Sequence, residues 1–450
     1  MDTQSATGFV TRRDVLKRGF LGTAGLALGG SLVPMPSIGM GTDGGSSSAA
    51  KAKAVIQIWM WGGPSHLDAF DPKPDAGYDY CGPLNKPIAT NADGIRICEL
   101  LPLLAQQADK YSIIRSMTHG NNSHETAAYI VQTGHQPDEP DRLVYPCIGA
   151  VVSLFKGYDH GYKGLVPPYV VLTQLQGRFS EAGFLGPRYK PFATGGDPNQ
   201  NLFAVEGIIA RGITDEHQRS RRELLHNLDS LGKAMPGNSQ FEKFDRCEEN
   251  AYTLMFGDAR KLFDLSQEQS ELRDRYGRNK FGQSCLMARR LVEAGVPYVT
   301  INYPGWDTHK QHFETMRRKL PEMDAGMATL LQDLADRGLL DSTIVWWSGE
   351  FGRGPKVQWE PPWNGGRSHY GKCFCALVAG GGLKGGRIVG ASDEKGMEVA
   401  ERPVHPADLL GTMYSLLGID PDGPMPNGKG LDLKVMPMPQ GTGGRLKEIT

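Results

Sequence analysis

The sequence lacks a net charge of either sign and a hydrophobic run long enough to span a membrane. Its 450 residues include 49 lysines and arginines against 50 aspartates and glutamates, so the formal net charge is −1. Without a basic excess, neither nucleic acid nor an anionic membrane surface is favoured as a partner. The most apolar N-terminal stretch, residues 19–33, is 15 residues long, shorter than the roughly 20 residues of a membrane span. We therefore expect no membrane span in the mature protein.

Cysteine is also scarce, whereas glycine and proline are abundant. The seven cysteines are odd in number and their spacing indicates no disulfide framework, so we expect small buried hydrophobic side chains. The 58 glycines and 30 prolines predict many tight turns and shaped loops. Because 39% of the residues are hydrophobic, a real core is expected, with helices as connectors around a sheet.

The N-terminus has the features of an export signal. Arg12 and Arg13 form a twin-arginine pair, and a weakly apolar, Gly/Ala-rich stretch follows them. The alternative, a basic amphipathic helix of the mature protein, is disfavoured because residues 43–54 form a Gly/Ser/Ala-rich linker without a packing pattern. We expect residues 1–50 to be a signal and linker that engages the twin-arginine export machinery. The protein would then be periplasmic or secreted.

Strands and helices alternate along residues 51–440, which predicts a single α/β domain. Six nearly continuous apolar runs fit a mainly parallel sheet flanked by helices on both faces. The predicted strands are 55–60, 111–116, 168–172, 297–303, 342–347 and 372–379. The predicted helices are 100–108, 125–132, 216–231, 240–256, 267–276, 283–294, 320–337 and 406–417. Residues 178–278 are mostly helical and charged, which indicates a helical insertion or cap on the sheet.

Polar side chains follow four of the predicted strands at the point where each strand ends. The four groups are His66 with Asp68, His119 with Ser123 and His124, Asp307 with His309 and His312, and Glu350 with Arg353. A fifth group, Arg367 and His369, precedes a strand in a loop long enough to fold back. Because the carboxyl ends of parallel strands share one edge of a sheet, we expect these groups to converge.

Histidine and carboxylate side chains together suit zinc or a similar divalent ion, with manganese or calcium as alternatives. The candidate ligands are Asp68, Asp307, His309, Glu350 and His369. Two ions about 4 Å apart activate a nucleophile and neutralise the leaving group of a phosphoryl or sulfuryl ester. Arg353 or Arg367 would hold the remaining anionic oxygens. The pattern therefore predicts hydrolysis of an anionic ester, such as a sulfated or phosphorylated carbohydrate.

Several of these residues have a structural interpretation as well. A single histidine is more often a hydrogen-bonded structural residue than a ligand. Asp307 precedes a helical run and suits a helix cap as well as it suits a metal. Glu350 favours a ligand role more strongly, because a carboxylate at the end of a buried strand needs a partner.

Long segments resemble an exported bacterial family, domain of unknown function 1501, which is assigned to the sulfatase and alkaline phosphatase superfamily. The matching segments are GGPSHLDAFDPKP, FGQSCLMARRLVEAGVPYVTINYPGWDTH, GLLDSTIVWWSGEFGR, GGGLKGGRIVGASDEKG and PVHPADLLGTMYSLLGID. The resemblance implies an alkaline-phosphatase-like or sulfatase-like α/β fold. It also implies metal ligands at Asp68, at Asp307 with His309 or His312, near Glu350, and at His369.

The resemblance breaks down at the nucleophile. Sulfatases carry a Cys-x-Pro-x-Arg signature ahead of Thr-Gly, but the comparable stretch here begins at Ser123 and His124 and has neither cysteine nor proline. Formylglycine chemistry is therefore not expected. Ser123, at the start of a predicted helix, either attacks the ester as in alkaline phosphatase or only caps the helix. Glu350 is followed by Phe351 instead of histidine, which weakens one metal site.

The sequence thus predicts an exported, metal-dependent hydrolase of phosphate or sulfate esters. In this hypothesis Ser123 or His124 stands at the reacting centre, and Arg353 is the anion clamp. The alternative is a catalytically degenerate protein of the same fold that binds a carbohydrate or a protein partner through the same crevice.

Overall fold

The structure is a computed structural model that describes residues 50–137, 143–175, 181–201, 259–438 and 441–450, with isolated residues between 203 and 224. These residues belong to one compact unit, Ser48–Thr450. The predicted export signal, and most of the predicted helices 216–231 and 240–256, lie outside the described residues. Within the described part of the chain, no helix is long and apolar enough to cross a membrane.

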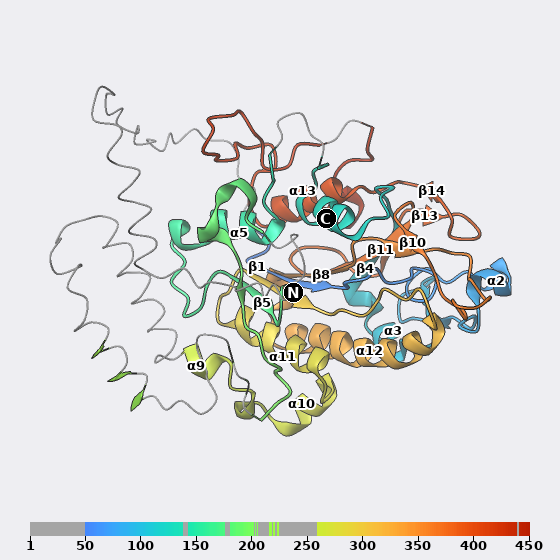
Figure 1. Cartoon of the computed structure of the whole chain (residues 1–450), viewed down its shortest axis with the longest axis horizontal. Helices are drawn as coiled ribbons and strands as arrows, with labels where there is room; N and C mark the ends of the chain where they lie inside the picture. Colours follow the sequence, from blue (N-terminus) through green and yellow to red (C-terminus); the bar gives the residue numbers. More distant parts are fainter. Residues whose placement is uncertain are drawn as a thin grey trace, which may run out of the picture. The chain divides into compact units, whose positions relative to one another are not determined.

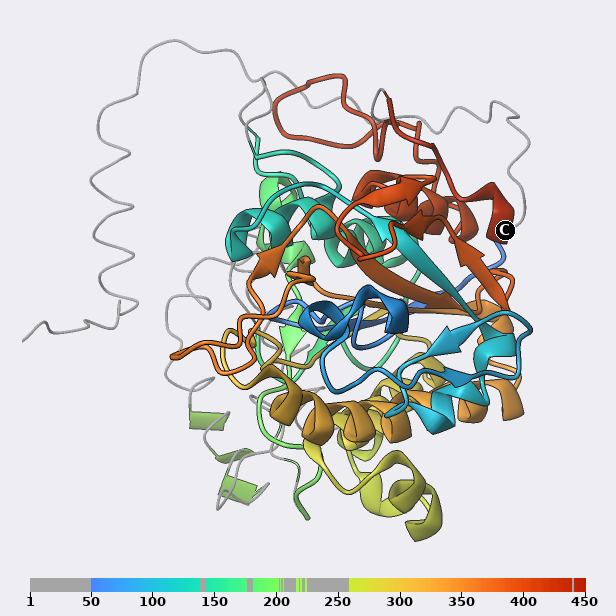
Figure 2. The same ribbon diagram turned by 90° about the vertical axis from the view of Figure 1, so that its right-hand side faces the viewer.

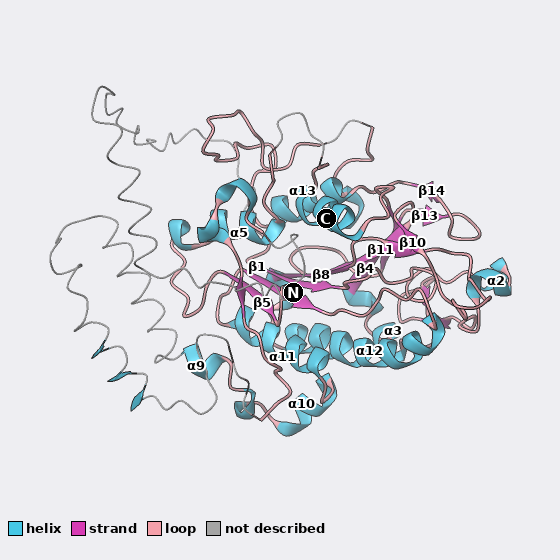
Figure 3. Cartoon of the chain, in the orientation of Figure 1, coloured by secondary structure: helices cyan, strands magenta, loops and turns pink. Residues whose placement is uncertain are grey.

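An eight-stranded sheet forms the centre of the unit, in the order β12-β4-β11-β8-β1-β7-β5-β6 (Figure 3). Its strands are β1 (Ala54–Trp59), β4 (Tyr111–Met117), β5 (Tyr169–Leu172), β6 (Phe192–Ala193), β7 (Tyr298–Asn302), β8 (Thr343–Ser348), β11 (Phe374–Ala379) and β12 (Arg387–Val389). Only β11 runs against its neighbours β4 and β8 in this sheet; the other pairs are parallel. The predicted mainly parallel α/β fold is confirmed.

Strand β1 shows why the sheet is covered on both faces. Successive side chains of a strand point to opposite faces, and every residue of β1 is buried. Val55 and Trp59 belong to one hydrophobic core, whereas Ile56 and Ile58 belong to the other. A strand that is apolar on both faces needs a layer of helices on each side.

The two helical layers lie above and below the sheet in Figure 1, and Figure 2 shows them from the side. One layer contains α3 (Pro102–Ala105), α10 (Ser270–Tyr276), α11 (Lys280–Glu293) and α12 (His312–Asp336). The other contains α4 (His124–Thr133), α5 (Ile148–Lys156) and α13 (Pro406–Leu416). The unit also contains the short helices α2 (Tyr78–Cys81) and α9 (Ala259–Leu262), and Ala259 of α9 belongs to the same core cluster as the first layer.

Three short two-stranded sheets shape the loops at the periphery of the unit. They are β2 (Ile88–Ala89) with β3 (Arg96–Ile97), β9 (Gly352–Arg353) with β10 (His369–Tyr370), and β13 (Ala391–Ser392) with β14 (Val399–Glu401). The second of these is important for the site, because it pairs His369 with Arg353 in antiparallel register.

The six predicted strands are all present, but the helices differ more from the prediction. Helix α12 begins at His312, not at residue 320, and continues through Pro321. Helix α3 is a single turn, shorter than the predicted helix 100–108. Helix α5 was not predicted; residues 148–154 are all buried, and a short apolar run of this kind is not easily distinguished from a buried strand by its pattern.

The cysteines behave as small buried hydrophobic side chains, as predicted. Cys81, Cys98, Cys147, Cys285, Cys373 and Cys375 are buried and free. Cys247 lies outside the described residues.

Candidate metal centre

Three parallel strands and one antiparallel strand bring the predicted site residues to one edge of the sheet. His124 follows β4 as the first residue of α4, Asp307 follows β7, and Glu350 follows β8. His369 precedes β11, whose first residue, Phe374, lies opposite the last residue of β4. An antiparallel strand begins at the edge where its parallel neighbours end. This is why His369 reaches the same place from the other direction.

His124, Asp307 and His369 converge so that one ligand atom from each lies within 4.8 Å of the other two. Nε2 of His124 is 3.3 Å from Oδ2 of Asp307, and Nε2 of His369 is 3.1 Å from Oδ1. His309 joins the group, because its Nε2 lies 2.8 Å from Nε2 of His369 and 3.1 Å from Oδ1 of Asp307. The structure therefore gathers three imidazoles around one carboxylate.

The far nitrogens of two of these rings are held by hydrogen bonds. Nδ1 of His124 lies 2.6 Å from Oε1 of Glu350, and Nδ1 of His369 lies 2.9 Å from the backbone oxygen of Asn122. Oxygen acceptors face both Nδ1 atoms, so each Nδ1 can donate a hydrogen bond while the Nε2 atom of the same ring faces Asp307. Histidine ligands of metals are oriented in the same way, with the second nitrogen donating to a carboxylate or carbonyl.

The electrostatics of the group centre on Asp307. Burial opposes its ionisation, but hydrogen bonds from His124 and His369 and the charge of Arg353 outweigh this and lower the pKa of Asp307. The hydrogen bonds to Asp307 and Glu350 raise the pKa of His124 to about 9. The carboxylates thus create a strong preference for positive charge at the position between His124 and Asp307.

Glu350 is buried beneath His124 and is held by the end of β1. Both of its carboxylate oxygens accept a hydrogen bond from the backbone N–H of Gly62, at 2.9 and 3.2 Å. Gly62 has a positive φ of 112°, and a Cβ there would lie 2.2 Å from the backbone nitrogen of Asp307. Only glycine lets the β1 turn pack this closely under the site.

Arg353 is fully buried, and its guanidinium group contacts other groups of the protein. It donates to the backbone oxygens of Gly62, Gly63 and Arg367, and its Nη2 lies 2.5 Å from Oδ1 of Asp307. Its contacts therefore fix Asp307 against the β1 turn. The role of Arg353 as a clamp for an anionic substrate stays a prediction. The contacts described are with the protein itself and do not support that role.

Asp68 lies in a separate buried network instead of beside Asp307. Its Oδ2 is 2.7 Å from Nε of Arg367, 2.9 Å from Nε2 of His312 and 2.6 Å from the hydroxyl of Ser65. These partners lower the pKa of Asp68 in spite of its burial. A ligand role for Asp68 is untested, but its oxygens already have partners.

This buried network supports the loop that carries Asp307. Nδ1 of His312 lies 2.6 Å from the hydroxyl of Thr308, and the backbone N–H of Arg367 donates to the backbone oxygen of Thr308 at 3.1 Å. Thr308 lies between Asp307 and His309 in the sequence. Asp68 therefore acts on two of the convergent side chains through His312 and Arg367.

Local geometry excludes a helix-capping hydrogen bond from the side chains of Asp307 and Ser123, which the sequence had left open. Asp307 does not cap the following helix, because α12 begins at His312 after Gln311. Ser123 precedes α4, but its side chain makes no capping hydrogen bond and is exposed. Its hydroxyl is therefore at the surface beside His124, at the N-terminus of a helix.

Sequence reasoning missed two backbone groups, the carbonyl of Asn122 and the N–H of Gly62. Every residue except proline carries both groups, so no residue type signals which of them will be used. In the sequence, only the glycine pair at residues 62–63 indicated a close backbone approach at this position.

The Asp68 network predicts a large stability effect. Asp68→Asn should destabilise the protein by about 3–5 kcal/mol, because it leaves the buried guanidinium of Arg367 without its counter-charge. Urea unfolding at neutral pH measures this difference, and Asp393→Asn, in a surface loop, is the control. A loss below about 1 kcal/mol would contradict the interpretation.

The contribution of the Asp68–Arg367 pair to the free energy of unfolding depends on pH in a defined direction. The pKa of folded Asp68 is lowered below the unfolded value of about 3.9. Its contribution is therefore complete above that pH and is lost as the pH falls through the folded pKa. The difference in unfolding free energy between wild type and Asp68→Asn should narrow below about pH 4. A constant difference down to the lowest accessible pH would argue against the ion pair.

Comparison with known proteins gives a family but no close relative of known activity. The family described as "Protein of unknown function (DUF1501)" matches residues 52–441. No curated protein sequence matches the chain.

Three solved structures illustrate the distant likeness. A protein in the alkaline phosphatase superfamily from Vibrio parahaemolyticus has 10% identity and a TM-score of 0.38, over 83% of this chain and 68% of that one. The PsFucS1 sulfatase from Pseudoalteromonas sp. has 14% identity and a TM-score of 0.35, over 82% and 68%. The C-terminal periplasmic domain of EcEptC from Escherichia coli, a complex with Zn, has 9% identity and a TM-score of 0.36, over 83% and 84%. Likeness at this level assigns no activity.

Proposed function

We propose that this chain, which belongs to the DUF1501 family, is an exported hydrolase that cleaves phosphate or sulfate esters with the help of a divalent metal ion, zinc in the first instance. The observation that carries the proposal is the convergence of His124, His309 and His369 on Asp307. The substrate class that we propose is the sulfated or phosphorylated carbohydrate.

The donor set fits a metal ion such as zinc. Nitrogen and carboxylate ligands are those that zinc prefers, and ligand atoms about 2.0–2.1 Å from a tetrahedral ion lie roughly 3.3 Å from one another. The separations at Asp307 are 3.1–3.3 Å, and the Nε2 atoms of His309 and His369 lie closer, at 2.8 Å. When bound, a divalent ion polarises the ester oxygens and neutralises charge on the leaving group.

Glu350 and Asp68 act indirectly in this proposal. Glu350 orients the ring of His124 through its 2.6 Å contact with Nδ1. Asp68 holds the loop of Asp307 and His309 through His312 and Arg367. Both carboxylates are therefore assigned here as positioning groups.

Ser123 is the proposed nucleophile. Its exposed hydroxyl lies at the N-terminus of α4, where the helix dipole favours an oxyanion. Attack would form a bond from Oγ to phosphorus or sulfur and break the bond to the alcohol oxygen. The serine proton passes to water, and the leaving alcohol takes a proton from water. A second water then releases the inorganic anion and restores the hydroxyl.

Export through the twin-arginine pathway is part of the proposal and rests on Arg12 and Arg13. This pathway carries folded proteins, so the site would be assembled before the chain reaches the periplasm or the exterior.

A second candidate function is a binding protein with a degenerate site. It is favoured by Phe351, which is fully buried and stacks on His369 with ring centroids 4.7 Å apart. An aromatic ring thus lies where the superfamily resemblance implies a histidine ligand. Such a protein would bind a carbohydrate or a protein partner without cleaving an ester.

Metal content separates the proposed site from a purely structural cluster. Purified wild-type protein should contain about one equivalent of zinc or manganese per chain, measured by plasma mass spectrometry. His369→Ala and Asp307→Asn should lose most of it, because each removes a convergent donor. The control His160→Ala changes an exposed histidine on a distant turn and should retain the metal. Equal metal content in all four proteins would exclude the assigned ligands.

Glu350→Gln tests the orienting carboxylate. It should weaken metal binding by about 10–100-fold, because the variant holds the imidazole of His124 less firmly. Competition with a fluorescent chelator measures the affinity, and Glu360→Gln, at an exposed loop position, is the control. An unchanged metal affinity would exclude the proposed role of Glu350 in orienting His124.

The nucleophile is tested with small aryl phosphates and sulfates. Ser123→Ala should reduce turnover by roughly 10³-fold or more and leave the metal in place. Ser415→Ala, an exposed serine on α13, is the matched control. Full activity of Ser123→Ala would eliminate the serine mechanism, and no activity of the wild type on any ester would favour the binding protein.

A further inference from the structure

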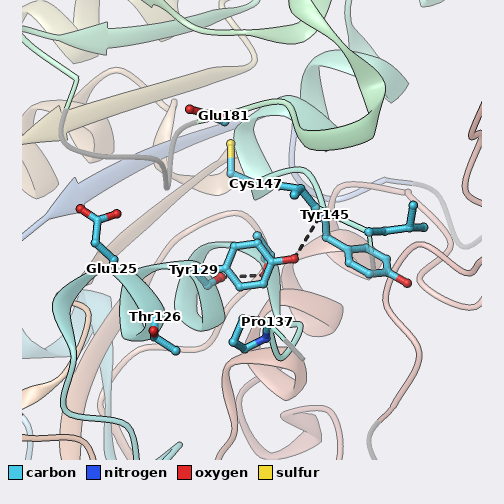
Figure 4. Close-up of a pocket in the computed structure, with 10 residues that line it drawn as sticks. Glu125, Thr126, Tyr129, Pro137, Tyr145, Cys147 and Glu181 are labelled. Atoms are coloured by element: carbon cyan, nitrogen blue, oxygen red, sulfur yellow. Dashed lines mark hydrogen bonds between the residues drawn. The ribbon is translucent and has the colours of Figure 1, made fainter. Parts of the chain in front are cut away.

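A pocket of about 260 Å³ runs along α4, the helix that begins at His124. It is lined by Glu125, Thr126, Tyr129, Thr133, Pro137, Leu143, Val144, Tyr145, Cys147 and Glu181 (Figure 4). Glu125, one of the lining residues, directly follows the candidate ligand His124 in α4. The pocket and the candidate metal centre therefore share helix α4.

Among the residues that the structure describes, the lining of this pocket holds two carboxylates and no basic side chain. Glu125 comes from α4, and Glu181 comes from a separate segment. The backbone oxygen of Glu181 accepts a hydrogen bond from the N–H of Cys147 at 3.1 Å. Such a lining repels an anion. The sulfate or phosphate group of a substrate thus belongs at the histidines, and an uncharged part belongs in the pocket.

The aromatic side of the pocket is rigid. The hydroxyl of Tyr129 accepts a hydrogen bond from the backbone N–H of Tyr145 at 2.9 Å, and Thr133 donates to the backbone oxygen of Tyr129 at 2.7 Å. Figure 4 shows the ring of Tyr129 between Glu125 and Tyr145. A fixed aromatic ring next to carboxylate acceptors suits a ligand that has apolar C–H faces and hydroxyl donors around its rim.

We propose that this pocket binds one neutral sugar ring of a carbohydrate ester, with Glu125 and Glu181 accepting hydrogen bonds from its hydroxyl groups. The inference rests on the proposed function for the identity of the ester, but the binding itself needs no turnover. The pocket volume of about 260 Å³ is compatible with a single sugar ring. The specificity of the enzyme would then reside on α4 and on the segment of Glu181.

Binding of unmodified sugars tests this assignment without any ester. Saturation-transfer NMR on the full chain would use galactose, glucose and mannose as neutral probes and choline as a cationic probe. The variants are the double substitution Glu125→Gln with Glu181→Gln, and Thr126→Leu, which fills the pocket without removing charge. Glu394→Gln, in an exposed loop, is the control for loss of an acid. Asp307→Asn separates the pocket from the metal centre.

The proposal requires that at least one neutral sugar binds the wild type and both Glu394→Gln and Asp307→Asn. Affinity should fall roughly tenfold or more in the double variant and in Thr126→Leu. Binding of choline without any sugar would identify a cation site and overturn the proposal. No sugar binding, or sugar binding that neither pocket variant weakens, would also overturn it. Because hydrolysis is not measured, an inactive site leaves this result intact, and a failed pocket leaves the hydrolase open.

Discussion

The carboxylate of Asp307 is the group on which the rest of the site depends. His309, His369 and Arg353 contact its Oδ1, and His124 contacts its Oδ2. Three separate parts of the chain meet at this one anion, so its charge decides where positive charge can be held. Arg353 contributes a fixed positive charge from below, whereas the Nε2 atoms of the imidazoles approach as neutral donors or as cations. In the proposed function, a divalent metal ion would take the place of a proton between these groups.

Two buried carboxylates keep that arrangement in place from opposite sides. Glu350 lies under His124 and is fixed by the N–H of Gly62, whereas Asp68 holds the loop that carries Asp307 through His312. Neither carboxylate stands alone in the interior, where an unpaired charge would be costly. Asp307 is thus a half-exposed carboxylate, whereas Glu350 and Asp68 are buried carboxylates that hold its neighbours in place.

The sequence predicted the strands and the sheet edge, because continuous apolar runs and parallel topology are local or general properties. It also predicted which loops meet. It did not predict which side chains touch, since partners of a buried carboxylate are distant in sequence: Glu350 pairs with His124 across 226 positions, and Asp68 with Arg367 across 299. The sequence placed Asp68 among the ligands and His124 at the reacting centre; in the structure His124 contacts Asp307, and Asp68 pairs with Arg367 and His312. The approach of His369 from the opposite direction depends on the reversed direction of β11, which a residue pattern does not specify.

The most direct test of this account is anomalous diffraction from crystals of the full chain grown with zinc, recorded at the zinc absorption edge. The account predicts a strong peak bounded by Nε2 of His124, Nε2 of His369 and the carboxylate of Asp307. A peak at Asp68, or no peak while the loops keep the geometry described above, would contradict the assignment of the metal centre and with it the proposed hydrolase.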